Sequence, residues 1–390
     1  MTKRILQLAS FAGNQGDNAN AAGTRALFQA TFAEPLVFDN LEIRNYFRGR
    51  QKFDDAFVDR CNAYDLVVIG GGNYFELWVE DSCSGTTIDI DVKRLARIKP
   101  PILFHALGFD DGMGAPPTAV ARARAWFAWL AVHPHKARVT LRNDGAMATA
   151  LRVLGPALSK SFVGMPDCGF FMPRPPATGL PPARGVRIGI NVAGDMPERR
   201  FAGFADGADG FVGEMVGALA SLCEAHPEME LTFFPHIHKD LRLVAMMLER
   251  LPDPVVRSRV RVAPFVTGPG TEDTFFAHYA ECDLVLGNRF HANVVPLGLA
   301  IPTLGLCNYP QIERFYGELG AEASMLDVSR PGFGVALLAA VQARLADLAS
   351  ERVRVAGVRE RMWQSARATM NDTAAWLGWQ TKQPKASHDV

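Results

Sequence analysis

The sequence lacks the features that mark membrane-spanning and polyanion-binding proteins. No apolar run reaches the roughly 18 residues of a membrane-spanning helix. The polar turn Gly13-Asn14-Gln15-Gly16-Asp17 begins where a signal peptide would still be apolar, so we expect a cytoplasmic protein. The 41 basic and 41 acidic residues cancel, which argues against a nucleic-acid-binding surface and leaves room for a local anion pocket.

Common cofactor and metal motifs are also missing. The six cysteines are widely spaced without a CxxC pair, so we interpret them as reduced, buried side chains. No GxxxxGK[ST] motif occurs, and Phe75 stands where GxGxxG would require its last glycine, which excludes a P-loop and a dinucleotide fingerprint. His236 and His238 have a spacing found in metal sites, but without a clear third ligand we expect no metal.

What the sequence does have is an alternation of apolar runs with amphipathic stretches. Runs that are apolar on both faces indicate strands of a parallel sheet that helices cover on both sides. They recur first at residues 4–9, 65–69, 102–107 and 139–141, and later at residues 186–192, 231–234, 260–263, 284–286 and 303–306. The chain is thus predicted to be an α/β protein.

A proline-rich stretch separates the two series of runs. Residues 173–185 hold five prolines, a density that disfavours helix and central strand, and we predict an interdomain linker there. It joins an N-terminal Rossmann-like domain at residues 1–175 to a second one at residues 186–364. A C-terminal helix, at about residues 365–390, is expected to pack back across the lobes and join the first domain. Two doubly wound domains with an interdomain cleft are typical of GT-B-like enzymes.

Ligands of such sheets bind beyond the carboxyl ends of the strands, so the strand ends supply the candidate residues. After the first strand, glycines such as Gly16 allow close backbone approach, and Asp17 or Asn18 can cap the next helix. The functional interpretation is that Asn14 and Asp17 contact a ligand. The other N-terminal candidates for substrate binding are Gly71, Gly72, Asn73, His105 and Arg142.

The segment Gly287-Asn288-Arg289-Phe290-His291 is the most informative, because it joins a buried strand directly to a helix. Backbone N–H groups and the helix dipole favour an anion there, and Arg289 adds a forked cationic donor suited to carboxylate or phosphate. His291 can donate a proton to a bound ligand. The other interpretation is an arginine buried with a carboxylate beside a packed histidine. Asn288 and His236 are further substrate-binding candidates.

These segments, taken in order, resemble the polysaccharide pyruvyl transferase family over roughly residues 10 to 305. The resemblance rests on the Gly13–Asp17 turn, the Gly70-Gly71-Gly72 strand end, Arg142 with Asp144, Pro166-Asp167, Pro235 with Asp240, and Gly287-Asn-Arg-Phe-His-Ala. It implies transfer of a pyruvyl group from phosphoenolpyruvate to two hydroxyls of a sugar, which forms a cyclic ketal and releases phosphate.

The resemblance suggests a role for each candidate. His291 is the expected general acid, Arg289 holds the phosphate or carboxylate, and Asp17 is a candidate base toward the acceptor. Arg142 would be a second anion clamp, and His105 or His236 would orient a hydroxyl. No cofactor or metal is expected beyond phosphoenolpyruvate as co-substrate. The partner is a sugar, oligosaccharide or lipid-linked glycan, and a lipid-linked acceptor would bring the protein to the inner membrane surface.

Two other functions remain open. A GT-B glycosyltransferase would share the fold and bind a nucleotide diphosphate at the same helix N-terminus. A non-catalytic carbohydrate-binding relative would keep the fold without turnover. Retention of both Arg289 and His291 argues against the second.

Overall fold

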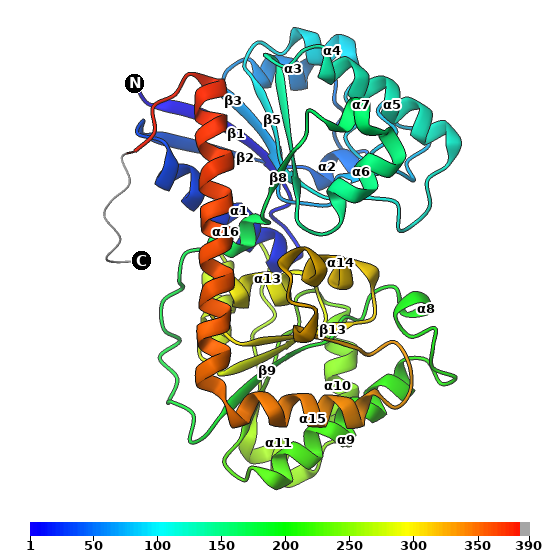
Figure 1. Cartoon of the computed structure of the whole chain (residues 1–390), viewed down its shortest axis with the longest axis vertical. Helices are drawn as coiled ribbons and strands as arrows, with labels where there is room; N and C mark the ends of the chain where they lie inside the picture. The colour runs from blue at the N-terminus through cyan, green and yellow to red at the C-terminus, as the bar shows by residue number, and fades with distance from the viewer. Residues whose placement is uncertain (383–390) are drawn as a thin grey trace. The chain divides into compact units, whose positions relative to one another are not determined.

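The computed structural model describes residues 1–382 and is an α/β protein with two six-stranded parallel sheets (Figure 1). Its residues separate into two compact units, unit 1 and unit 2, each built around one of the sheets. The predicted α/β class is thus confirmed. The end of the expected C-terminal segment, residues 383–390, lies outside the described residues.

Among the described residues, unit 1 comprises Met1–Phe11, Asn20–Phe171 and residues 362–382. Its sheet has the order β2-β1-β3-β5-β7-β8. The strands are β1 (Lys3–Ala9), β2 (Leu36–Glu42), β3 (Leu66–Gly70), β5 (Ile102–Leu107), β7 (Ala137–Arg142) and β8 (Val163–Met165). Two short strands, β4 (Phe75–Glu76) and β6 (Phe109–Asp110), pair separately in parallel. The helices are α1 (Gln15–Thr31), whose first turn belongs to unit 2, and α2 (Arg44–Phe47), α3 (Asp55–Cys61), α4 (Val92–Arg97), α5 (Pro117–Ala131), α6 (Ala146–Leu154) and α7 (Pro156–Ser159).

Unit 2 comprises Ala12–Ala19 and Met172–Arg361. Its sheet has the order β11-β10-β9-β12-β13-β14. The strands are β9 (Arg187–Asn191), β10 (Glu230–Phe233), β11 (Val260–Val262), β12 (Leu284–Gly287), β13 (Thr303–Cys307) and β14 (Met325–Asp327). The helices are α8 (Pro197–Arg200), α9 (Ala208–Ala225), α10 (Asp240–Arg250), α11 (Asp253–Arg259), α12 (Glu272–Tyr279), α13 (His291–Gly298), α14 (Pro310–Leu319) and α15 (Phe333–Ala346). The last helix, α16 (Leu348–Leu377), begins in unit 2 and ends in unit 1.

The central strands are buried on both faces, which explains their unbroken apolar runs. Every residue of β3 and of β12 is buried, so side chains that alternate between the two faces all meet a covering helix. Each fully buried Leu, Ile or Val contributes about 1.5–3 kcal/mol relative to an exposed one. In unit 2, α9 and α15 lie side by side on one face of the sheet (Figure 1).

The segment Ala12–Ala19 groups with unit 2, although both of its flanks belong to unit 1. Ala19 packs in a buried cluster with Val285 of β12 and Ala292 of α13. From the sequence this segment is expected in the first domain, because local periodicity does not reveal which core a turn will join.

Within residues 1–382, no single helix is long and apolar enough to cross a membrane. One pair, α15 and α16, meets that criterion only when its two helices are taken together, and they are bent by 92°. Phe333, Leu337 and Val341 of α15 are buried in the core of unit 2.

Candidate functional site

The junction between β12 and α13 is held by a buried asparagine. Asn293 donates its Nδ2–H groups to the backbone oxygens of Gly287 (3.0 Å) and Arg289 (2.8 Å), and its Oδ1 accepts from the Tyr316 hydroxyl (2.9 Å). A Cβ on Gly287 would meet the Ala292 oxygen at 2.6 Å, so the strand can turn this closely only at glycine. The junction therefore places Arg289 just before α13 and His291 at its first residue.

The Gly13–Asp17 turn, whose last three residues form the start of α1, packs directly against this junction, and both lie in unit 2. A Cβ built on Gly16 would stand 2.4 Å from Nδ1 of His291 and 2.5 Å from its Cβ and Cγ. Gly16 also donates its N–H to Oδ1 of Asn14 (3.0 Å), and Nδ2 of Asn14 donates to Asp17 (3.3 Å). The half-buried Asp17 thus belongs to the same turn, and the imidazole rests on bare backbone.

Two side chains outside the predicted site residues, those of Gln15 and Asn18, fix this turn to the rest of unit 2. Gln15 donates to the Val266 oxygen (2.6 Å) and to the Thr271 hydroxyl (3.0 Å), and Asn18 donates to the Gly268 oxygen (2.7 Å). Both side chains are buried. From the sequence, polar residues in a glycine-containing turn are expected to be solvated. Only the tertiary structure shows that these two side chains are buried and hold the turn in place.

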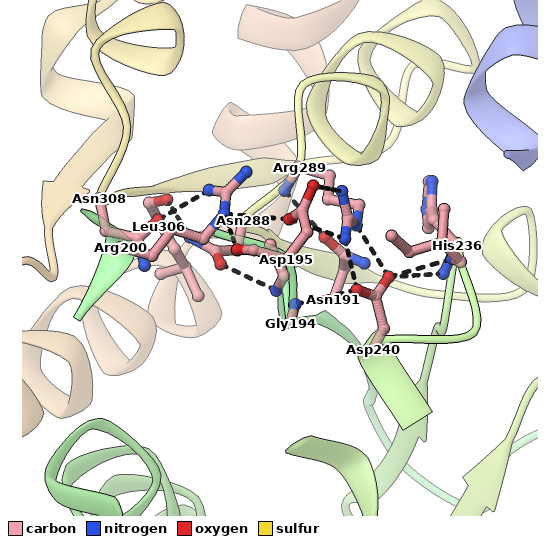
Figure 2. Close-up of polar contacts among 12 residues, drawn as sticks. Asn191, Gly194, Asp195, Arg200, His236, Asp240, Asn288, Arg289, Leu306 and Asn308 are labelled. Carbon is pink, nitrogen blue, oxygen red and sulfur yellow. Dashed lines mark hydrogen bonds and ion pairs between the residues drawn. The ribbon is translucent and has the colours of Figure 1, made fainter. Parts of the chain in front are cut away.

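Arg289 is enclosed by two carboxylates (Figure 2). Its Nε donates to Asp240 (2.8 Å), its Nη2 donates to both Asp240 and Asp195, and its Nη1 donates to Asp195 (3.3 Å). Burial by itself lowers the pKa of Arg289, but the two carboxylates raise it above its ordinary value. The arginine is therefore a permanent cation. Its contacts are those of the second interpretation given above, in which an arginine is buried with a carboxylate.

Asp240 has the character of a structural anchor. Its carboxylate accepts backbone N–H groups from Gly194 (2.9 Å), His236 (3.0 Å) and Ile237 (3.2 Å), besides the two bonds from Arg289. It thereby ties the ends of β9 and β10 to the β12–α13 junction. Three backbone donors and a guanidinium compensate the cost of burying this charge.

Asn288 continues the polar network toward Arg200, Asp195 and Asn308, three residues outside the set predicted from the sequence. Asn288 accepts from the Ala193 N–H (2.9 Å) and donates to Oδ1 of Asn308 (2.8 Å). The same Oδ1 accepts from Nη1 of Arg200 (3.1 Å), and Nε of Arg200 donates to Asp195 (3.2 Å). Asn288 is thus part of the scaffold beneath the two arginines.

His236 lies in the same unit but is engaged in packing. Its Nε2 is 2.8 Å from the Tyr279 hydroxyl, and its ring meets Phe275 edge-on. Burial, reinforced by the charges of Arg289 and His291, holds the pKa of His236 well below its ordinary value. The imidazole is therefore neutral at physiological pH.

The glycine run after β3 in unit 1 is filled by the chain itself. A Cβ on Gly71 would stand 2.1 Å from Oδ1 of Asn20, and one on Gly72 would stand 2.3 Å from the ring of Tyr74. Gly71 has a φ of +83° and donates its N–H to the His105 oxygen (3.1 Å). These contacts account for the glycines without a ligand.

His105 is completely buried, and its Nε2 is 3.3 Å from the Cys168 sulfur. Burial lowers its pKa to about 4, although Asp167 acts in the opposite direction. A neutral imidazole with these contacts packs the core of unit 1.

Arg142 of unit 1 is surrounded by acidic groups. Its Nε donates to Asp144 (2.5 Å), and its Nη1 is 3.7 Å from Asp167. Nearby, Glu76 and Asp110 are register partners on β4 and β6, and Asn73 donates to Asp110 (2.9 Å). Burial, helped by the charge of Asp110, raises the pKa of Glu76 to about 8. The carboxylates of Asp144 and Asp167 thus balance the positive charge of Arg142, as Asp195 and Asp240 do for Arg289 in unit 2.

The structure therefore divides the predicted residues between the two units. Unit 2 brings together Asn14, Gly16, Asp17, His236, Asn288, Arg289 and His291, whereas Gly71, Gly72, Asn73, His105 and Arg142 lie in unit 1. Among the described residues, no group of three or more His, Cys, Asp or Glu side chains is placed to hold a metal ion.

The family model for polysaccharide pyruvyl transferase matches residues 14–308, which include both sets of residues. Among curated proteins, none matches the sequence significantly.

Solved structures that resemble this chain have the GT-B fold. UDP-GlcNAc 2-epimerase from Neisseria meningitidis, bound to UDP-GlcNAc, superimposes with a TM-score of 0.56 at 9% identity, covering 95% of this chain and all of that one. HepE from Anabaena, in complex with UDP and glucose, gives 0.53 at 12% identity, covering 96% of this chain and 98% of that one. MnaA from S. aureus with UDP gives 0.52 at 11% identity, covering 98% and 99%. At such identities the likeness concerns the fold alone, and it confirms the GT-B-like prediction.

Proposed function

Because the chain belongs to the polysaccharide pyruvyl transferase family, we propose that it transfers a pyruvyl group from phosphoenolpyruvate to two hydroxyls of a sugar, releasing phosphate. The contact between Gly16 and His291 carries this proposal. It brings two motifs from opposite ends of the matched region together in one unit, with a histidine at the start of a helix and a buried arginine beside it.

The chemistry needs an anion site and a proton donor. Protonation of the methylene carbon of phosphoenolpyruvate generates a cation that the enol oxygen stabilises, and one sugar hydroxyl then adds to it. Loss of phosphate and addition of the second hydroxyl complete the ketal, while the two hydroxyl protons leave to a base and to phosphate. We assign proton donation to His291 and anion binding to Arg289.

Asp17 is the proposed base toward the acceptor. It is half-buried, and it lies in the turn whose Gly16 contacts His291. The acceptor class is a sugar, free or lipid-linked, and no further cofactor is part of the scheme.

Ligand-dependent thermal stability tests the proposal, because a ligand that binds only the native state raises its melting temperature. We expect phosphoenolpyruvate, and neither UDP nor GDP, to stabilise the protein. The gain should vanish in Arg289→Lys, which keeps the charge beside Asp240 but loses the forked donor. Arg257→Lys, at an exposed ion pair on α11, is the matched control and should behave as wild type. Stabilisation by UDP or GDP alone would instead indicate glycosyl transfer.

A further inference from the structure

Two buried arginines of unit 2 share one partly exposed carboxylate. Figure 2 shows Asp195 between Arg289 and Arg200. The side chains of Arg289 and Arg200 are 11% and 6% exposed, and that of Asp195 is 25% exposed. Asp240, the other partner of Arg289, is completely buried. The two carboxylates that hold Arg289 therefore differ in their access to water.

They also differ in how they are held. Asp240 accepts three backbone N–H groups in addition to Arg289. The hydrogen bonds that the Asp195 side chain makes to other described residues all come from the guanidinium groups of Arg289 and Arg200. Asp195 can thus leave by breaking only these guanidinium bonds and a hydrogen bond to its own N–H, whereas Asp240 would release the N–H groups of three other residues.

A buried donor beside Arg200 is left unused. Asn308 is 8% exposed, and its Oδ1 accepts from both Arg200 and Asn288. Its Nδ2 is buried and has no hydrogen-bond partner in the described part of the chain. An unmade hydrogen bond at a buried amide is costly, and a ligand oxygen at this position would complete it.

We propose that Arg200, Asn308 and the Nη1 and Nη2 groups of Arg289 form a carboxylate-binding subsite. The Asp195 side chain occupies this subsite until a ligand carboxylate replaces it. The inference rests on the proposed function, since phosphoenolpyruvate supplies that carboxylate. The Asp195 side chain marks the position, because it is itself a carboxylate shared by two forked cationic donors. The exchange keeps the local charge constant: one carboxylate leaves for water as another enters.

Asp195 then acts as an internal competitor that keeps the two guanidinium groups paired in the free protein. In the free protein, Asp195 lowers the fraction of molecules whose subsite is open, and this raises the apparent dissociation constant of the ligand. A variant without this carboxylate should therefore bind ligand carboxylates more tightly. The same variant should be less stable when free, because two buried cations lose a shared partner.

Pyruvate, phosphoenolpyruvate and inorganic phosphate, titrated separately by calorimetry or ligand-observed NMR, test the subsite. In Asp195→Asn we expect pyruvate and phosphoenolpyruvate to bind at least fivefold more tightly than to wild type, roughly the scale of a modest allosteric coupling. Inorganic phosphate should gain less than pyruvate. Glu198→Gln is the matched control, because it removes an exposed carboxylate from α8, the helix that carries Arg200, and should change affinity little. Arg200→Lys, a second variant that keeps the charge, should weaken pyruvate binding.

Unchanged or weaker pyruvate binding in Asp195→Asn would overturn the proposal. So would an equal gain in Glu198→Gln, or a gain for phosphate as large as that for pyruvate. If pyruvate follows the expected pattern while phosphoenolpyruvate stabilises no variant, the subsite stands and the proposed transfer reaction fails.

Discussion

The backbone of Gly16 lies against the imidazole of His291, so close that a methyl group on the glycine would stand 2.4 Å from Nδ1. A side chain in that position forces the histidine or the turn to move. We expect Gly16→Ala to lower phosphoenolpyruvate-dependent phosphate release by about 100-fold, the effect of displacing a reacting group by about 1 Å. Overpacking should also cost about 1–3 kcal/mol of unfolding free energy.

The control for this variant is Gly217→Ala on the exposed side of α9, where an added Cβ meets no atom within 4 Å. It should retain activity and gain slightly in stability, because alanine favours helix. Wild-type turnover in Gly16→Ala would show that the close contact has no bearing on the chemistry.

His291→Gln separates binding from proton transfer. Glutamine keeps a polar side chain of similar length but cannot act as a general acid at neutral pH. We expect kcat to fall between about 100- and 10,000-fold, while the dissociation constant of phosphoenolpyruvate stays close to that of wild type. Steady-state kinetics and calorimetry on the same preparation measure both. A large loss of affinity with unchanged kcat would assign His291 to binding.

Asp240→Asn tests the anchoring role of the buried carboxylate. The change leaves Arg289 with Asp195 as its single anionic partner and removes a charge that three backbone N–H groups also use. Removing one partner from a buried pair costs about 3–5 kcal/mol. Chemical denaturation should show this loss, and Asp195→Asn should lose less, because its side chain is partly hydrated.

Glu76→Gln tests the raised pKa in unit 1. A carboxyl group with a pKa of about 8 in the folded protein, against the ordinary glutamate value of 4.5, retains its proton when the unfolded chain has lost it. Its contribution to stability is therefore present at pH 4.5 and is lost as the pH rises to 8. Glutamine mimics the protonated form, so the unfolding free energy of the variant relative to wild type should increase between about pH 5 and pH 8.5. A difference independent of pH would refute the shift.

The sequence predicts the sheet strands well because their signal is local. Runs such as residues 102–107 are apolar at every position but one, and the structure places β5 at Ile102–Leu107. The two-residue strands β4 and β6 give no such signal, since a pair of residues has no period. The carboxyl pair of Glu76 and Asp110 is for that reason invisible in the sequence.

The site is predictable only as far as its motifs extend. Arg289 and His291 stand next to a strand–helix junction that sequence reveals, and family order links them to the Gly13–Asp17 turn. Asp195 and Arg200 follow β9 in a segment that reads as an ordinary turn, and their partner Asn308 comes after β13. Such pairing is set by the order of strands in the sheet, which neither spacing nor composition encodes.

The assignment of Ala12–Ala19 to unit 2 has a consequence for how the chain can be divided. Besides the connection near Met172, the polypeptide passes between the units before Ala12, within α1 and within α16. Cutting the proline-rich linker would leave the two parts joined by continuous helices. Neither unit corresponds to one uninterrupted stretch of sequence. A fragment that ends at the linker would therefore contain the Gly16 turn without His291, and each of the two fragments would lack part of the core that its own residues build.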